Sequence, residues 1–106
     1  MGKARSGHVL ATIVFTDIVD SSRFANELGD RRWRVLLDRH HAIIRNAIRR
    51  NYGKEIDNAG DGFFARFRDQ VDAIKFACQA TADVQELGIE IRAGATSVKP
   101  KCSARS

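Results

Sequence analysis

The sequence predicts an α+β domain in which an antiparallel sheet carries its helices on one face, in the ferredoxin-like manner. Three observations support this fold class. An apolar, β-branched run lies near the N-terminus, two later stretches repeat apolar residues at three- and four-residue steps, and a Gly-Asp-Gly turn separates two short strand-like runs. The predicted order is strand, helix, helix, two hairpin strands, helix, strand.

The first strand is predicted over Val9–Phe15, a run apolar enough to be buried on both faces. Polar residues follow at once: Asp17, Asp20, Ser21 and Ser22. A carboxylate at the end of a buried strand can bind a hard cation, and the N–H groups that open a helix can bind phosphate. The alternative is that these residues only cap the next helix. The sequence leaves both interpretations open.

Two helices are predicted next. A short one covers Ser21–Leu28 and is closed by Gly29, and a longer one runs from Asp30 to the Tyr52-Gly53 pair. The apolar stripe of the longer helix comprises Trp33, Leu36, Leu37, His40, Ile43, Ile44, Ala47 and Ile48. Neither His40 nor the adjacent His41 has a partner at metal-ligand spacing on this helix, so both are interpreted as structural.

A hairpin is predicted from strands at 54–59 and 63–67, with Asp61 at its tip between Gly60 and Gly62. A plain hairpin turn needs only Asp-Gly, so a purely structural role for Asp61 stays open. In a ferredoxin-like sheet the first strand can lie beside this hairpin, which would bring Asp17 and Asp61 together. Two carboxylates at one place favour a bound cation, and oxygen ligands favour Mg²⁺ or Mn²⁺.

The remaining chain predicts one helix, one strand and a tail. The helix covers 69–87, and the strand covers 89–93. The inner stripe of the helix is expected to be Val71, Ile74, Ala77, Cys78, Thr81, Val84 and Leu87, which makes Cys78 a core thiol. The expected division is a flexible basic arm at 1–8, one domain at 9–94 and a disordered tail at 95–106.

Composition narrows the class of protein. The net charge of +5 fits either an anionic partner or an arginine-rich solvated surface. Cys78 and Cys102 are far apart, which favours reduced thiols and a cytoplasmic location, and no stretch is long enough to span a membrane. Nucleic-acid binding is not expected, because few aromatics interleave with the arginines and Phe63, Phe64 and Phe67 lie in an apolar context.

Two motifs, Phe15-Thr-Asp-Ile-Val-Asp-Ser-Ser22 and Ala59-Gly-Asp-Gly-Phe-Phe64, resemble the first half of a class III adenylate/guanylate cyclase catalytic domain. The actinobacterial type is the most similar. The resemblance runs from about Ala11 to Gly94. Both motifs and the helix between them occur in the family order.

The resemblance implies roles for specific residues. Asp17 and Asp61 would be the two metal-binding aspartates, joined by the backbone carbonyl of Ile18, at a two-ion Mg²⁺ or Mn²⁺ site. The N–H groups of Val19, Asp20, Ser21 and Ser22 would bind the β- and γ-phosphates of ATP or GTP. The implied reaction converts ATP to cyclic AMP and pyrophosphate. Asp57 stands where the family commonly has a lysine that helps to read the purine.

The family continues beyond the point that this chain resembles, with a dimerisation arm and the groups that stabilise the transition state. The resemblance therefore implies a truncated domain that retains the metal- and phosphate-binding half and turns over little alone, as a homodimer or beside an intact cyclase chain. The alternative is a non-catalytic interaction module that pairs with an intact cyclase and modulates it.

Overall fold

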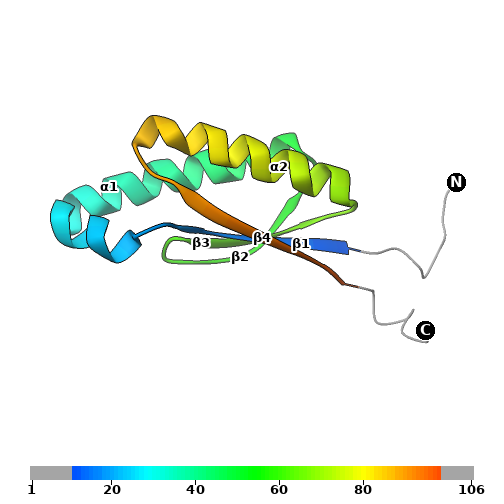
Figure 1. The fold of residues 1–106 in the computed structure, drawn as a ribbon, viewed down its shortest axis with the longest axis horizontal. Coiled ribbons are helices and arrows are strands. Elements are labelled where there is room, and N and C mark those ends of the chain that lie inside the picture. Colours follow the sequence, from blue (N-terminus) through cyan, green and yellow to red (C-terminus); the bar gives the residue numbers. More distant parts are fainter. Residues whose placement is uncertain (1–10, 99–106) are drawn as a thin grey trace, which may run out of the picture.

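A computed structural model describes residues 11–98, which form a four-stranded sheet with two helices on one face (Figure 1). The strands are β1 (Ala11–Ile18), β2 (Lys54–Ala59), β3 (Gly62–Phe67) and β4 (Ile91–Val98), and the helices are α1 (Ser21–Arg50), α2 (Gln70–Asp83) and the short 3₁₀ helix η2 (Val84–Leu87). The strands lie in the order β2-β3-β1-β4, and every neighbouring pair is antiparallel. The predicted fold class is confirmed. The predicted basic arm at 1–8 lies outside the described residues.

β1 is buried on one face, not on both as predicted. Thr12, Val14, Thr16 and Ile18 are buried under the helices, whereas Phe15 points to the other side and is 44% exposed. The reason is that α1 and α2 lie on the same side of the sheet (Figure 1). The opposite side, called the open sheet face below, has no helix over it among residues 11–98.

The two predicted helices at 21–50 form the single element α1, with a break at Gly29 where the backbone has φ 81° and ψ 167°. Only glycine adopts this conformation readily, so the predicted position of the break is confirmed. All four buried residues of α1 follow the break: His40, Ile44, Ala47 and Ile48. The second part of α1 is therefore the part that anchors the helix to the sheet.

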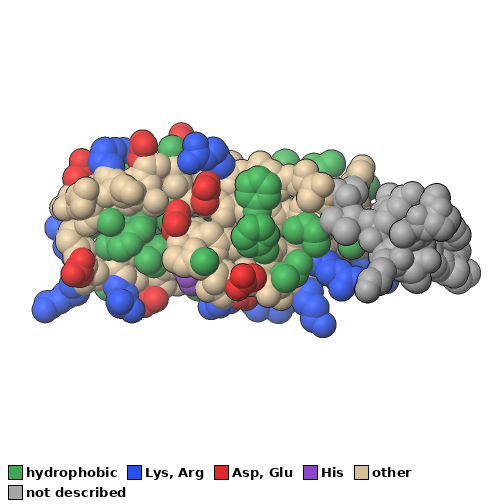
Figure 2. Space-filling view, turned by 90° about the horizontal axis from the view of Figure 1, so that it is seen from below, with side chains coloured by type: hydrophobic (Ala, Val, Ile, Leu, Met, Phe, Trp, Pro, Cys, Tyr) green, Lys and Arg blue, Asp and Glu red, His purple; other side chains and the backbone are tan. Residues whose placement is uncertain are grey.

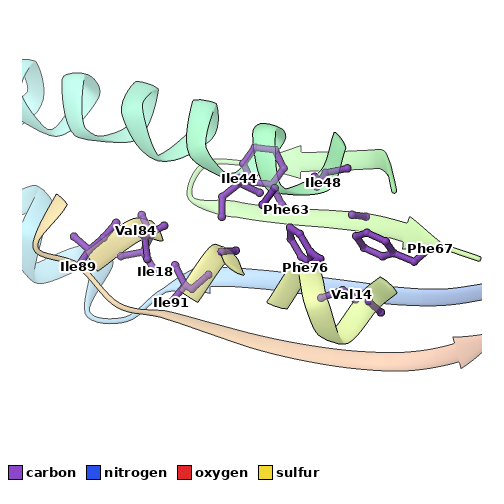
Figure 3. Close-up of a cluster of buried hydrophobic side chains, with 14 residues drawn as sticks. Val14, Ile18, Ile44, Ile48, Phe63, Phe67, Phe76, Val84, Ile89 and Ile91 are labelled. Carbon is purple, nitrogen blue, oxygen red and sulfur yellow. The ribbon is translucent and has the colours of Figure 1, made fainter. Parts of the chain in front are cut away.

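The core lies between the helices and the sheet (Figure 3). Phe63 and Phe67 of β3 face Phe76 of α2, and the rings of Phe67 and Phe76 lie 5.0 Å apart. Branched residues fill the space around the rings: Val14, Ile18, Ile44, Ile48, Val84, Ile89 and Ile91. The burial of this apolar surface positions β1 and the β2–β3 hairpin relative to each other.

The predicted inner stripe of the 69–87 helix is correct at Val84 and Leu87, which are buried and half-buried against the core, and wrong at Val71, Ile74 and Cys78. The buried residues are Ala73, Phe76, Ala80 and, in η2, Val84, while Val71 and Ile74 are 59% and 62% exposed. Cys78 is also exposed and is not a core thiol. The helix has apolar residues on several sides, and the largest of them decides which side faces the sheet, because apolar burial scales with area. That residue is Phe76, which packs on Phe67.

β4 begins at Ile91, two residues later than the strand predicted at 89–93, and is longer than predicted. It continues to Val98 and pairs with β1 at eight positions, from Ala11↔Val98 to Ile18↔Ile91. The first four residues of the predicted tail, 95–98, therefore belong to the sheet, and residues 99–106 lie outside the described residues. This part of β4 contains small residues, and backbone pairing with β1 rather than side-chain periodicity holds it in the sheet.

Two glycines lie against aromatic rings and should respond differently to substitution. A Cβ at Gly53 would overlap the ring of Phe67, and one at Gly94 would overlap the ring of Phe15. Phe67 is 1% exposed and cannot move aside, so Gly53→Ala is expected to destabilise the fold by about 1–3 kcal/mol. Phe15 is half-exposed and can rotate away, so Gly94→Ala is expected to cost less than about 1 kcal/mol. Urea unfolding of both variants measures the difference, and equal losses would contradict it.

Candidate functional site

The tip of the β2–β3 hairpin lies against the end of β1. Oδ2 of Asp61 accepts a hydrogen bond from the backbone N–H of Ile18 at 3.0 Å, between residues that are 43 positions apart. The register of β1 with β3 places them there, because Thr16 is paired with Phe63 and the next residues toward the tip reach Asp61. The structure thus brings the second acidic motif to the end of the first.

Asp17 occupies the position before Ile18 and faces the open sheet face, since the side chains of a strand alternate. It is paired across the sheet with Arg92 of β4, and Arg92 Nε lies 3.4 Å from its Oδ1. The Asp17 side chain is 47% exposed and that of Arg92 68% exposed. An ion pair this open contributes only about 0–1 kcal/mol. The Asp17 carboxylate is therefore accessible to a ligand.

The turn between β1 and α1 has a strained residue at its centre. Asp20 has φ 61° and ψ 35°, in the left-handed region that residues with a Cβ seldom adopt. It occupies the N-cap position, yet its side chain makes no capping hydrogen bond to α1. The first turn of α1 contains no acidic residue. The interpretation that this segment only caps a helix therefore does not account for Asp20.

Not all backbone N–H groups of the turn between β1 and α1 are available to bind an anion. Val19 donates its N–H to the carbonyl of Glu90 at 2.9 Å, so this group is already used within the protein. The N–H of Phe24 donates to the carbonyl of Asp20 at 3.1 Å, which is the first hydrogen bond of the helix. The N–H groups of Asp20, Ser21 and Ser22 lie before this first bond. The opening N–H groups of a helix have no partner within the helix, and they carry its positive dipole end. An anion is favoured there.

Asp57 lies on β2 opposite Phe64, next to an irregularity in the pairing between Glu55 and Asp57. It is exposed, and its Oδ1 accepts the backbone N–H of Asn58 at 2.8 Å. Among residues 11–98, no hydrogen bond joins Asp57 to Asp17 or Asp61. Asp57 therefore lies on the same hairpin as Asp61, without a hydrogen bond to it in the described residues.

The carboxylates of Asp17 and Asp61 are ligands of the type that a hard cation prefers. Asp61 uses only Oδ2 for the bond to Ile18, and Asp17 is held only by an exposed, long ion pair. Each carboxylate thus keeps an oxygen free, and Mg²⁺ accepts one or two carboxylates when phosphate and water complete its shell. Within the described residues, no three His, Cys, Asp or Glu side chains form a complete metal site. An ion bound by these two carboxylates would need further ligands, such as phosphate and water, to complete its shell.

Two neighbours of the site were not predicted as such. Arg92 neutralises Asp17 across the β1–β4 pair, and only the register reveals this. His40, interpreted as structural, is fully buried and lies near enough to Asp61 for the carboxylate to oppose the fall in the pKa of the imidazole. In the sequence, only the position of His40 on the apolar stripe of the helix indicates that its side chain is buried.

The open sheet face next to Asp17 is partly apolar. Phe15 and Phe64 are both half-exposed, and their ring centroids lie 6.1 Å apart on this face. Figure 2 shows hydrophobic side chains in the middle of the face and charged side chains around them. The half-exposed Phe64 contradicts the expectation that all three phenylalanines of β3 lie in an apolar context.

A family profile and a set of solved structures match this chain. The profile of the adenylate and guanylate cyclase catalytic domain matches residues 4–103. No protein of curated function matches in sequence. None of the described helices has the length and hydropathy of a membrane-spanning segment.

Several solved structures share the fold. A bacterial light-regulated adenylyl cyclase superposes with a TM-score of 0.78 and 19% identity, over 85% of this chain and 54% of its own. The adenylyl cyclase CyaB from P. aeruginosa gives 0.76 and 17%, over 85% and 56%. The guanylate cyclase domain of RhGC from Catenaria anguillulae, solved with GTP, gives 0.75 and 16%, over 85% and 57%. The chain thus spans little more than half the length of these solved chains.

Proposed function

Because the chain belongs to the family of adenylate and guanylate cyclase catalytic domains, we propose that it binds the divalent-metal complex of ATP or GTP at the end of β1. Asp17, Asp61 and the Ile18 carbonyl bind the ion. The first turn of α1 binds the phosphates. The observation that carries the proposal is the 3.0 Å hydrogen bond from Ile18 to Asp61, which joins the two acidic motifs.

The residues of the site have distinct roles in this proposal. Asp61 is oriented by the Ile18 N–H, which fixes one carboxylate oxygen and leaves the other for the ion. Asp17 supplies a second carboxylate from the neighbouring residue of β1. The N–H groups of Asp20, Ser21 and Ser22 remain for the phosphates, since Val19 already donates to Glu90. A bound Mg²⁺ or Mn²⁺ would neutralise phosphate charge and activate a ribose hydroxyl.

The proposal assigns binding to this chain and no catalytic residue. Loss of one group that stabilises transition-state charge costs about 10²–10³-fold in rate, so little formation of cyclic AMP and pyrophosphate is expected from the chain alone. Asp57, at the position of the base-reading lysine, gives no basis for choosing ATP over GTP. We propose a cytoplasmic location for the protein, because ATP and GTP are present in the cytoplasm.

The carboxylate of Asp17 is the sharpest test of the site. Asp17→Asn keeps the shape of the side chain and removes the charge, and it is expected to weaken Mn²⁺–ATP binding by at least about tenfold, or about 1.4 kcal/mol. Calorimetric titration measures the change. The fold should be unaffected, because the ion pair with Arg92 is exposed.

Two control variants make the result specific. Asp57→Asn removes an exposed carboxylate from the same hairpin and should leave Mn²⁺–ATP affinity unchanged. Arg92→Gln removes the partner of Asp17 but keeps the carboxylate, and affinity should stay the same or rise. Equal affinity for the wild type and Asp17→Asn would refute the proposed site.

The alternative function, a module that pairs with an intact cyclase and modulates it, has support in the exposed apolar side chains of the open sheet face, Phe15 and Phe64. It predicts that the chain changes the cyclic AMP production of an intact cyclase and that Asp17→Asn does so equally well. The Asp17→Asn variant therefore distinguishes the two proposed functions.

A further inference from the structure

A groove of about 510 Å³ lies where η2 packs against α1, and it is called the α1–η2 groove below. Its apolar lining comprises Phe24, Leu28, Val35, Leu36 and Leu87. Phe24, Leu36 and Leu87 are half-buried against the core, whereas Val35 is 52% exposed. Cavities of this size bind small organic molecules in other proteins. The apolar lining favours a ligand with a hydrocarbon part.

Three arginines, Arg31, Arg32 and Arg39, also line the α1–η2 groove. Glu86 is the one acidic residue of the lining, so the groove carries a net positive charge. Among residues 11–98, none of the three guanidinium groups forms a hydrogen bond or an ion pair. The groove therefore combines apolar surface with positive charge that has no partner within the described part of the chain.

The sequence of α1 explains why these arginines lack an internal partner. Residues three and four positions apart are neighbours on a helix. The positions three and four residues from Arg32 and Arg39 hold no acidic residue: they are Leu28, Gly29, Val35, Leu36, Ala42 and Ile43. Arg31 has Glu27 four positions earlier, but the break at Gly29 separates them, and Glu27 pairs with a different arginine. The counter-ion of these arginines therefore comes from outside the chain.

We infer that the α1–η2 groove binds one molecule of a long-chain carboxylate, with its alkyl chain on the apolar lining and its head group on a guanidinium. Arg39 follows Arg32 by seven residues, about 10 Å along the helix axis, so the positive charge is spread along the groove. One guanidinium binds a carboxylate through two parallel hydrogen bonds. The higher charge of a phosphate is matched by an arginine cluster at one point, so the spread arrangement favours the carboxylate.

This inference is independent of the proposed metal site. It rests on the groove and its charges, to which neither Asp17 nor Asp61 contributes. Failure of nucleotide binding would leave the inference standing, and failure of carboxylate binding would leave the proposed nucleotide site standing.

The test is calorimetric titration of the full chain with dodecanoate, below the concentration at which dodecanoate self-associates and without metal or nucleotide. The expected result is one bound molecule per chain, with slower amide hydrogen exchange at residues 21–28 and 84–87, which contribute apolar side chains to the groove. The double variant Arg31→Gln/Arg32→Gln should bind dodecanoate at least about tenfold more weakly, because it removes two of the three positive charges of the lining.

Arg34→Gln/Arg50→Gln is the matched control. Both residues are exposed on α1 and lie outside the groove, so this variant loses the same charge and should keep the affinity for dodecanoate. Circular dichroism of both double variants checks that they fold.

Two further ligands separate the contributions of the chain and the head group. Acetate, which lacks the alkyl chain, and dodecyltrimethylammonium, which carries a positive head group, should not bind measurably. Four results would overturn the inference: no binding of dodecanoate, equal losses in the two double variants, equal affinity for dodecyltrimethylammonium, or binding to vesicles of anionic phospholipid without binding of monomeric dodecanoate.

Discussion

Phe63→Ala is expected to destabilise the protein by about 3–5 kcal/mol, because it removes a fully buried ring and leaves a cavity. Phe63 is 1% exposed and lies under α1. Its ring centroid is 4.9 Å from that of His41 and 5.8 Å from that of His40, and the Arg45 guanidinium lies 5.5 Å from it. Urea unfolding measures the loss of unfolding free energy.

Phe64→Ala is the matched control for this result. Phe64 is the next residue of β3, but it points to the open sheet face and is 46% exposed. Its main contact is with Phe15, which is also half-exposed. The expected loss is about 1 kcal/mol, the size of an aromatic pair contact. Similar losses for Phe63→Ala and Phe64→Ala would contradict the position of the core.

Acid is expected to destabilise the fold through His40. Burial, and then the neighbouring His41, lower the pKa of His40 to about 4, while Asp61 acts in the opposite direction. The folded state therefore binds the proton less well than the unfolded state, in which the pKa is about 6.5. The contribution of neutral His40 to the free energy of unfolding is full above pH 6.5 and is lost as the pH falls toward 4. The expected loss is about 2 kcal/mol at pH 5 and about 3 kcal/mol at pH 4.

His40→Leu isolates this effect from the titration of carboxylates. The variant should show a flatter fall in unfolding free energy between pH 7 and pH 4, with the difference from the wild type close to the values above. Its absolute stability is a separate quantity, because leucine also removes the 3.1 Å contact between Nδ1 of His40 and Nδ1 of His41. Parallel pH profiles for the two proteins would show that His40 is not the group responsible.

The sequence predicts the features that depend on local pattern. The position of the hairpin and the break at Gly29 follow from residues with one dominant conformational preference, and the structure confirms both. The approach of Asp61 to the end of β1 follows from the topology of the fold, and the bond to Ile18 shows it.

The errors arise where several residues compete or where a distant partner decides. α2 has apolar residues on more than one side, and the contact of Phe76 with Phe67, which the helix sequence alone does not contain, selects the buried side. Likewise, the N–H of Val19 is bonded to Glu90, a residue 71 positions away that precedes β4. Side-chain pattern carries no information about either partner.

The break at Gly29 divides α1 into two units, a shorter one at 21–28 and a longer one at 30–50. The buried residues that fix α1 to the sheet, from His40 to Ile48, all belong to the longer unit. The shorter unit, which contributes Ser21 and Ser22 to the proposed phosphate site, is joined to it through a backbone conformation that only glycine tolerates well. The half-buried Phe24 packs the shorter unit against the core, whereas four buried residues fix the longer unit, so the shorter unit has the weaker attachment.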